Sequence, residues 1–138
     1  GQDSKRLQVR VEKLGLSAWV RRMGYLEQNE LRLVYRLASA FVFPSLCEGF
    51  GFPLLEAMAS GVPVVASLTS AIPEVCGDAA EFFPPDDPEG MARKIILVLE
   101  DSETREQLIA RGKKRVGAFR WEKAAGETLA FYKALVEG

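Results

Sequence analysis

Two glutamates eight positions apart are the only charged residues in the stretch CEGFGFPLLEAMASGVPVV, residues 47–65. Glu48 precedes a Gly-Phe-Gly turn, and Glu56 lies in the first turn of an otherwise apolar helix that Pro53 opens. Because side chains on a helix lean toward its N-terminus, we expect the Glu56 carboxylate to point back at the turn. The two carboxylates would then bracket one space and accept hydrogen bonds from several hydroxyl groups of a ligand.

Both parts of this pattern also have a simpler interpretation. Gly49 and Gly51 either let a ligand reach the backbone amides or only make a turn. Glu56 either binds a ligand or favours the helix dipole, an effect of about 0.3–1 kcal/mol. We expect apolar residues around Glu56, and an ionised carboxylate is costly to bury without a partner, so the dipole is too weak an explanation. The sequence therefore favours a ligand rich in hydroxyl groups.

The elements around these residues predict an α/β fold, with a Rossmann-like parallel sheet flanked by helices. Strands are expected at residues 18–24, 40–44, 62–66 and 80–83, and helices at about 4–14, 29–39, 53–60, 88–100, 103–116 and 121–136. The strand at 40–44 is apolar without alternation, which is typical of a strand covered on both faces. Residues 45–52 leave its carboxyl end, where open parallel sheets bind ligands, and enter a helix N-terminus with free backbone N–H groups.

Three further local features follow from the sequence. Asn29 is expected to cap the second helix, whose buried face combines Leu31, Val34, Tyr35 and Ala38. The residues from Ser67 to Ala79 are expected to form a functional loop. The two cysteines, Cys47 and Cys76, fit no metal or disulfide spacing and are expected to be reduced and buried, and the run RGKKR at 111–115 is expected to be a solvated helix face.

The composition is ordinary for a globular protein and limits the chemistry. The length of 138 residues fits one domain, and a net charge of −1 gives no general attraction to nucleic acid. No apolar run approaches the roughly 20 residues that cross a bilayer, so we expect no membrane span and a cytoplasmic location, with the parent protein either free or peripheral at the cytoplasmic membrane face. There is no histidine, which removes the commonest general base and metal ligand. Carboxylates and free amides alone suit a polyhydroxylated ligand with phosphate, such as a sugar nucleotide.

The segment FVFPSLCEGFGFPLLEAMASGVPVVAS resembles the donor-site segment of retaining glycosyltransferases of family four, the glycosyl transferases group 1. These enzymes have the GT-B fold of two facing Rossmann-like domains, and this chain is similar to the C-terminal one, which binds the nucleotide-sugar donor. Glu48 and Glu56 match the family's motif of two glutamates separated by seven residues. The segments TSAIPEVCGDAAEFFPPDDP and FRWEKAAGETLAFYKAL match as well, so the resemblance extends from about Leu14 to near the end of the chain.

The resemblance implies roles for individual residues. Glu56 would bind the ribose hydroxyls of the nucleotide, and Glu48, at the catalytic position, would hold hydroxyls of the transferred sugar without acting as a nucleophile. The family needs no metal or other cofactor, because its chemistry is usually drawn as a front-face displacement assisted by the leaving phosphate. Ser67, Thr69 and Glu74 border the same edge, where a contact to the donor and a structural role are equally expected. Backbone amides would contact the sugar and the distal phosphate around Gly49, Phe50, Gly51 and Phe52.

The departures from the family pattern predict a partial domain. Two earlier strands, with the Arg and Lys that neutralise the donor pyrophosphate, and the whole N-terminal acceptor domain have no counterpart in residues 1–138. The strands at 19–23 and 40–43 would then lose their neighbours, so we expect them to pair directly or to form a swapped or edge-paired homodimer. The last helix carries an apolar stripe for ordinary core packing or for the absent domain. That stripe consists of Trp121, Ala125, Leu129 and Tyr132.

Two functions of different kinds remain open on the sequence. The first is part of an enzyme that transfers a hexose, of glucose or mannose type, from a nucleoside-diphosphate sugar to a glycan, lipid or small acceptor, with the isolated chain inactive. The second is a non-catalytic excised or engineered Rossmann half that keeps the motif as an inheritance. A phosphorylase or an epimerase is disfavoured, because the pyridoxal lysine site and the Gly-rich dinucleotide turn are not evident. The donor base, the sugar and the acceptor are not specified by the sequence.

Overall fold

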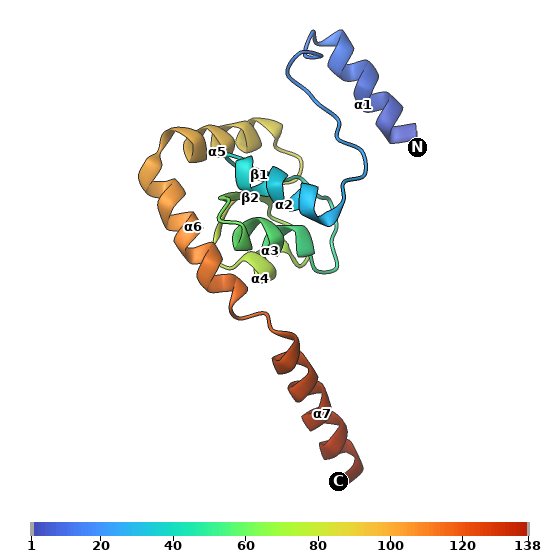
Figure 1. The fold of residues 1–138 in the computed structure, drawn as a ribbon, viewed down its shortest axis with the longest axis vertical. Helices are drawn as coiled ribbons and strands as arrows, with labels where there is room; N and C mark the ends of the chain where they lie inside the picture. The colour runs from blue at the N-terminus through green and yellow to red at the C-terminus, as the bar shows by residue number, and fades with distance from the viewer. Residues whose placement is uncertain (1, 138) are drawn as a thin grey trace. The chain divides into compact units, whose positions relative to one another are not determined.

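The fold is a three-stranded parallel sheet with helices on both faces, as predicted. It is seen in a computed structural model that describes residues 2–137 and the side chains from Lys5 to Val136. The strand order is β1-β2-β3, so that β2 lies in the middle. Figure 1 labels β1 and its neighbour β2 among the helices. The strands are β1 (Phe41–Phe43), β2 (Val64–Ser67) and β3 (Ala80–Phe83). The chain divides into two compact units between Leu31 and Arg32.

The first unit contains helix α1 (Gln2–Lys13), which is followed by Gly15 in a left-handed conformation with φ +67°. The predicted strand at 18–24 is wrong, because this segment has no regular secondary structure. The amides of Trp19 and Val20 donate to the carbonyl of Leu16 in a local turn, at 2.9 and 3.0 Å. A strand needs a neighbour for its backbone groups, and no strand of the described chain provides one. The predicted pairing of 19–23 with 40–43 is therefore not formed.

The helices after the first unit follow the predicted pattern closely. They are α2 (Gln28–Leu37), α3 (Phe52–Ala59), α4 (Ile72–Cys76), α5 (Pro88–Glu100), α6 (Ser102–Val116) and α7 (Trp121–Glu137). Helix α2, which begins in the first unit, starts one residue before the predicted cap Asn29, and the Glu30 carboxylate accepts the amide of Glu27 at 2.9 Å instead. Tyr35 is buried as expected, whereas Val34 is exposed. The predicted loop from Ser67 to Ala79 contains α4, a single turn and a half that Pro73 helps to open.

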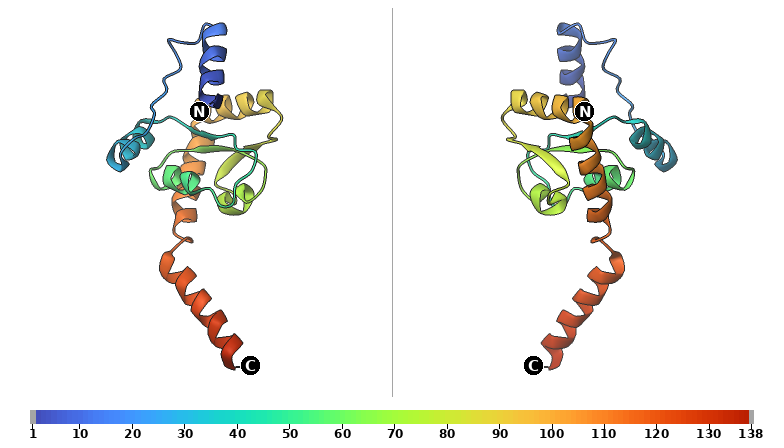
Figure 2. Two further views of the ribbon diagram at one scale, coloured as in Figure 1. Left: turned by 90° about the vertical axis from the view of Figure 1, so that its right-hand side faces the viewer. Right: turned by 90° about the vertical axis from the view of Figure 1, so that its left-hand side faces the viewer.

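The core lies on both faces of the sheet. Helices α3 and α5 both contact the sheet and α6 packs against both helices; Figure 2 shows α5 on one side of the strands and α3 on the other. The main cluster combines Val65 of β2 and Phe83 of β3 with Val98 and Leu108 of the helices. Strand β2 is buried throughout, whereas β1 is only half-buried, since it pairs on one side alone. Both faces of β1 nevertheless carry packing contacts, since Val42 packs against the main cluster and Phe41 against Tyr35 of α2, so the predicted cover of 40–44 is partial.

Helix α6 is joined tightly to α3 and α4. Gly112 is buried, and a Cβ atom there would lie 3.1 Å from the Met58 Cγ atom of α3. The Arg115 guanidinium donates to the carbonyls of Glu74 and Val75 and lies 4.9 Å above the Phe119 ring. The run RGKKR is therefore only partly a solvated face. Gly112 and Arg115 within it make packing contacts that the charge pattern did not reveal.

The two cysteines differ in their surroundings. Cys76 is buried in α4, and burial raises the pKa of its thiol to about 11 although the nearby Arg115 charge opposes the shift. Cys47 is exposed, which corrects the expectation that both are buried. Its position in the loop after β1, outside any helix or strand, explains the difference.

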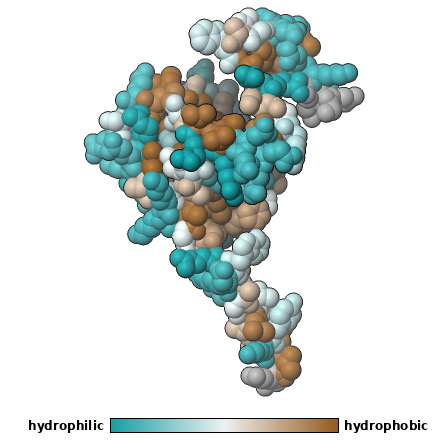
Figure 3. Space-filling view, in the orientation of Figure 1, coloured by the Kyte–Doolittle hydropathy of each residue, from teal (hydrophilic) through white to brown (hydrophobic). Residues whose placement is uncertain are grey.

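Helix α7 leaves its apolar residues exposed. Every described residue of α7 is exposed, including the four of the predicted stripe, so the stripe is not packed into the core of the described chain. Figure 3 shows apolar surface on this helix. No helix among residues 2–137 is long and apolar enough to span a membrane.

Candidate functional site

The candidate site begins where β1 ends and the loop to α3 starts. Glu48 lies in this loop, half-buried, and its Oε1 atom accepts a hydrogen bond from the Ser45 hydroxyl at 2.8 Å. The Ser45 hydroxyl also lies 3.3 Å from the carbonyl of Cys47. Glu48 is thus held by its own loop in one position, with its second carboxylate oxygen left for another donor.

Two hydroxyl side chains, one at the end of β2 and one just after it, hold this loop by hydrogen bonds. Ser67 is fully buried and donates to the carbonyl of Ser45, and its hydroxyl lies 3.4 Å from the carbonyl of Phe43. Thr69 donates to the carbonyl of Leu46 at 3.3 Å. The structure therefore shows a bracing role for both residues. Their direct contact with a donor stays a prediction.

Removing the Ser67 hydroxyl is expected to destabilise the fold. In Ser67→Ala the carbonyl of Ser45 loses the hydrogen bond from a fully buried hydroxyl, which costs about 1–2 kcal/mol. Urea denaturation followed by circular dichroism measures the change, and Ser39→Ala, at an exposed position, is the matched control. An unchanged midpoint in Ser67→Ala would show that the hydroxyl does not brace the loop.

The Gly-Phe-Gly turn has two glycines with different requirements. Gly51 is buried, caps the N-terminus of α3 and has φ +97°, and a Cβ atom there would lie 2.8 Å from Leu54 Cδ1. Gly49 is exposed, and a Cβ atom there would contact nothing. No side chain caps α3, and the amides of Gly49, Phe50 and Gly51 have no acceptor within residues 2–137. These amides are available to an anion or a hydroxyl group.

Glu56 differs from expectation in its direction and in its surroundings. Its Oε2 atom accepts a hydrogen bond from the hydroxyl of Tyr35 in α2 at 3.1 Å, and within residues 2–137 no hydrogen bond joins the carboxylate to the turn. The side chain is exposed, so the argument from the cost of a buried carboxylate does not apply. Helical periodicity explains this, since Leu54, Ala57 and Met58 occupy the inward positions of α3 and leave position 56 outside.

Tyr35 is a partner of the candidate site residue Glu56 that the sequence pattern did not identify. Its ring is buried and lies edge-on to Phe41 of β1, with centroids 5.5 Å apart. Burial, followed by the charge of Glu56 and the hydrogen bond to it, raises the pKa of Tyr35 to about 12. The available signal was a tyrosine at a buried helical position, because a buried tyrosine hydroxyl usually finds a partner.

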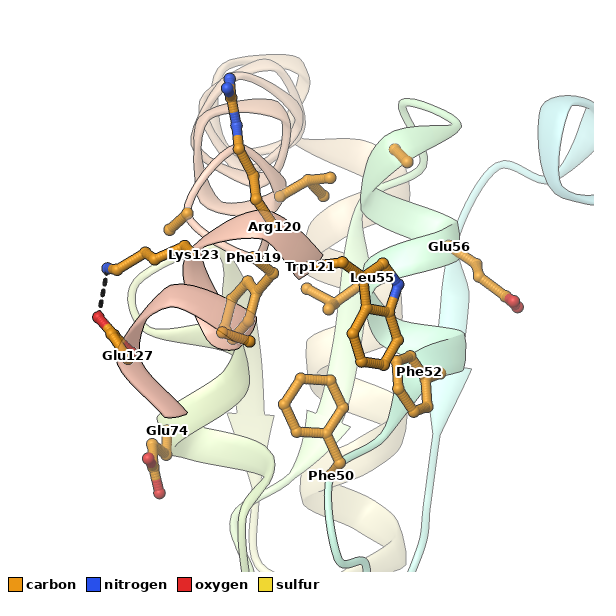
Figure 4. Close-up of a pocket in the computed structure, with 14 residues that line it drawn as sticks. Phe50, Phe52, Leu55, Glu56, Glu74, Phe119, Arg120, Trp121, Lys123 and Glu127 are labelled. Atoms are coloured by element: carbon orange, nitrogen blue, oxygen red, sulfur yellow. Dashed lines mark ion pairs between the residues drawn. The ribbon is translucent and has the colours of Figure 1, made fainter. Parts of the chain in front are cut away.

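An aromatic cluster extends from the turn toward the start of α7. The Phe50 ring lies 4.8 Å from that of Phe52 and 5.6 Å from that of Phe119, and Phe52 stacks on Trp121 at 6.5 Å (Figure 4). Beside it is an open pocket of about 920 Å³. Its lining includes Glu56 and Glu74 but not Glu48, Ser67 or Thr69. Figure 4 shows the Glu56 side chain extending from α3 away from the aromatic rings.

The predicted residues thus form two groups in the structure. Glu48, Ser67 and Thr69 belong to the braced loop, and Phe50, Phe52 and Glu56 border the open pocket. The turn with Gly49 and Gly51 connects the two groups along the chain. Phe119 was not singled out by sequence reasoning, although it lies within a matched family segment.

Comparisons with known proteins identify the family of the chain. The family model described as "Glycosyl transferases group 1" matches residues 1–115. The O-antigen chain mannosyltransferase B of Escherichia coli is 41% identical over 125 residues, which are 91% of this chain and 33% of that protein. The chain therefore spans about a third of the length of this curated relative.

Two solved structures share the fold. Sucrose-phosphate synthase from Thermosynechococcus elongatus superposes with a TM-score of 0.87 at 30% identity, covering 99% of this chain and 35% of that one. The C-terminal domain of a glycosyl transferase group 1 family protein from Francisella tularensis gives 0.74 at 31% identity, covering 85% and 62%. The chain belongs to the glycosyl transferases group 1 family and has the fold of the C-terminal domain of a GT-B glycosyltransferase.

Proposed function

We propose that the full-length protein, meaning the protein that contains this chain, transfers a hexose from a nucleoside-diphosphate sugar with retention of configuration. The observation that carries the proposal is the fixed Glu48 carboxylate beside a turn whose amides have no acceptor in the described chain, at the carboxyl end of β1. Mannose is the proposed hexose, since the Escherichia coli relative is a mannosyltransferase. The acceptor is a glycan, a lipid or a small molecule.

Each part of the site has a distinct role in this proposal. Glu48 accepts hydrogen bonds from hydroxyls of the transferred sugar and so orients its anomeric carbon. The amides at Gly49–Phe52 stabilise the charge that develops on the leaving phosphate, as helix N-termini do for anions. Glu56 binds the ribose hydroxyls. The proposed reaction uses the donor's own leaving phosphate as the proton acceptor and assigns no role to a metal ion or another cofactor.

Further residues outside this chain complete the proposed enzyme. Because the chain spans only about a third of its relative, we propose that the acceptor domain and the basic residues for the pyrophosphate lie in the remainder. The isolated chain is then inactive and binds the donor weakly, in the millimolar range. Transfer takes place in the cytoplasm or at the cytoplasmic face of the membrane.

A panel of nucleotide sugars tests the proposal. Titration calorimetry on the full-length protein is expected to find one donor that binds, and Glu56→Ala is expected to weaken its binding about 10- to 100-fold, because it removes charge-assisted hydrogen bonds to ribose. Glu89→Ala, at an exposed position of α5, is the control. Failure of every nucleotide sugar to bind the wild-type protein would refute the proposal, and inversion at the anomeric carbon of the product would refute its stereochemistry.

A further inference from the structure

The Glu56 carboxylate is restrained from a neighbouring helix. Its Oε2 atom accepts the Tyr35 hydroxyl at 3.1 Å, and this is the one hydrogen bond that the described chain gives to the carboxylate. Glu56 is otherwise an exposed side chain at the surface of α3. Without Tyr35, the side chain would be free to sample several rotamers.

The Tyr35 ring is itself fixed. It is 7% exposed, the buried residue of α2, and packs edge-on against Phe41 at an interplanar angle of 65°. Phe41 stacks on Phe43 of the same strand, with centroids 5.9 Å apart. Packing against β1 therefore fixes the position of the Tyr35 hydroxyl. The same strand leads into the loop that contains Glu48.

We propose that Tyr35 is a positioning residue that orients the Glu56 carboxylate toward the vicinal hydroxyls of the nucleotide ribose. The inference rests on the proposed function, in which Glu56 binds ribose. A hydroxyl that remains protonated at neutral pH can only donate to a carboxylate, and this leaves Oε1 and one lone pair of Oε2 for the ligand. Two acceptor atoms at fixed positions match two adjacent hydroxyls and discriminate against a sugar that lacks one of them.

The test compares ribonucleotides with deoxyribonucleotides. GDP, UDP and ADP and their 2′-deoxy counterparts are titrated into the full-length protein, and the base that binds is then used throughout. Tyr35→Phe removes one oxygen atom and is expected to weaken binding of the ribonucleotide about 5- to 20-fold and of the deoxyribonucleotide less than 2-fold. The ratio of the two affinities should therefore fall, which a general loosening of the fold would not produce.

The control variants separate the possible failures. Tyr132→Phe, at an exposed position of α7, should leave the ratio unchanged. Phe41→Leu keeps the Tyr35 hydroxyl but removes the Phe41 ring that packs against Tyr35. It should lower the ratio of the two affinities to a smaller extent than Tyr35→Phe. This variant therefore provides the test if Tyr35→Phe does not fold. If Glu56→Ala lowers the ratio but Tyr35→Phe and Phe41→Leu do not, the role of Tyr35 is wrong. Equal weakening of both nucleotides in Tyr35→Phe would also overturn it. If Glu56→Ala leaves the ratio unchanged, the proposed role of Glu56 itself is wrong.

Discussion

Replacing Glu48 by glutamine in the full-length protein is expected to lower kcat/KM for the donor about 100-fold or more. The carboxylate is held by Ser45 at 2.8 Å and is proposed to accept hydrogen bonds from hydroxyls of the transferred sugar. Each hydrogen bond to a charged group contributes about 1.5–3 kcal/mol, and 1.4 kcal/mol corresponds to a factor of ten in rate. Glutamine keeps the size of the side chain but has one acceptor oxygen and no charge.

The measurement is the initial rate of sugar transfer from the donor identified by the binding panel. We expect most of the loss in kcat, because the orientation of the sugar matters most in the transition state. The control is Glu89→Gln, which makes the same substitution at an exposed glutamate of α5. A Glu48→Gln enzyme within threefold of the wild type would show that the charge of this residue is not used.

Replacing Gly51 by alanine is expected to destabilise the fold by about 2–3 kcal/mol. One part of the cost is conformational, since φ is +97° at this position and a residue with a Cβ atom rarely adopts it. The other part is steric, because the new Cβ atom would lie 2.8 Å from Leu54 Cδ1, and Leu54 is fully buried, so its side chain would have to repack within the core. Urea denaturation followed by circular dichroism measures the change.

Gly49→Ala is the matched comparison, two residues earlier in the same turn. A Cβ atom at Gly49 contacts nothing in the described chain, so stability should change by less than about 0.5 kcal/mol. Donor binding should nevertheless weaken in the full-length protein, because the methyl group would stand where the donor is proposed to approach the amide. Equal destabilisation by the two substitutions would contradict the distinction between the glycines.

The sequence predicted most of the elements that depend on local signals. The strand at 80–83 and the last three helices lie within a residue or so of their predicted limits. For these helices the start and stop signals are in the chain itself, such as the Asp101 side chain, which accepts the amides of Glu103 and Thr104 at the start of α6. Hydrophobic periodicity and caps are enough where an element's own residues determine it.

Elements that depend on distant partners were predicted less well. The apolar segment 18–24 has the composition of a strand, but its backbone bonds to Leu16 because no neighbouring strand is formed in the described chain. The half-burial of β1 likewise follows from its place in the strand order, which periodicity does not contain.

The candidate site was identified by its motif but not by its geometry. The pair of glutamates and the two glycines were found from spacing and residue type. The contact between Glu56 and Tyr35 joins residues 21 positions apart, and the bonds from Ser67 to the loop after β1 and to the last residue of β1 join residues 22 and 24 positions apart. Pairings of this kind depend on how α2, α3 and β2 pack, so no local pattern could reveal them.

The close approach of α3 and α6 depends on the lack of a side chain at Gly112. Gly112 lets the two helices approach until a single methyl group on α6 would press on Met58 at 3.1 Å. Because α3 also carries Glu56 and begins at the turn, a larger residue at 112 would push α3 away and shift the carboxylate that is proposed to bind the nucleotide, without touching any ligand. A substitution at position 112 of α6 is therefore a way to change the affinity for the substrate without altering a residue of the candidate site.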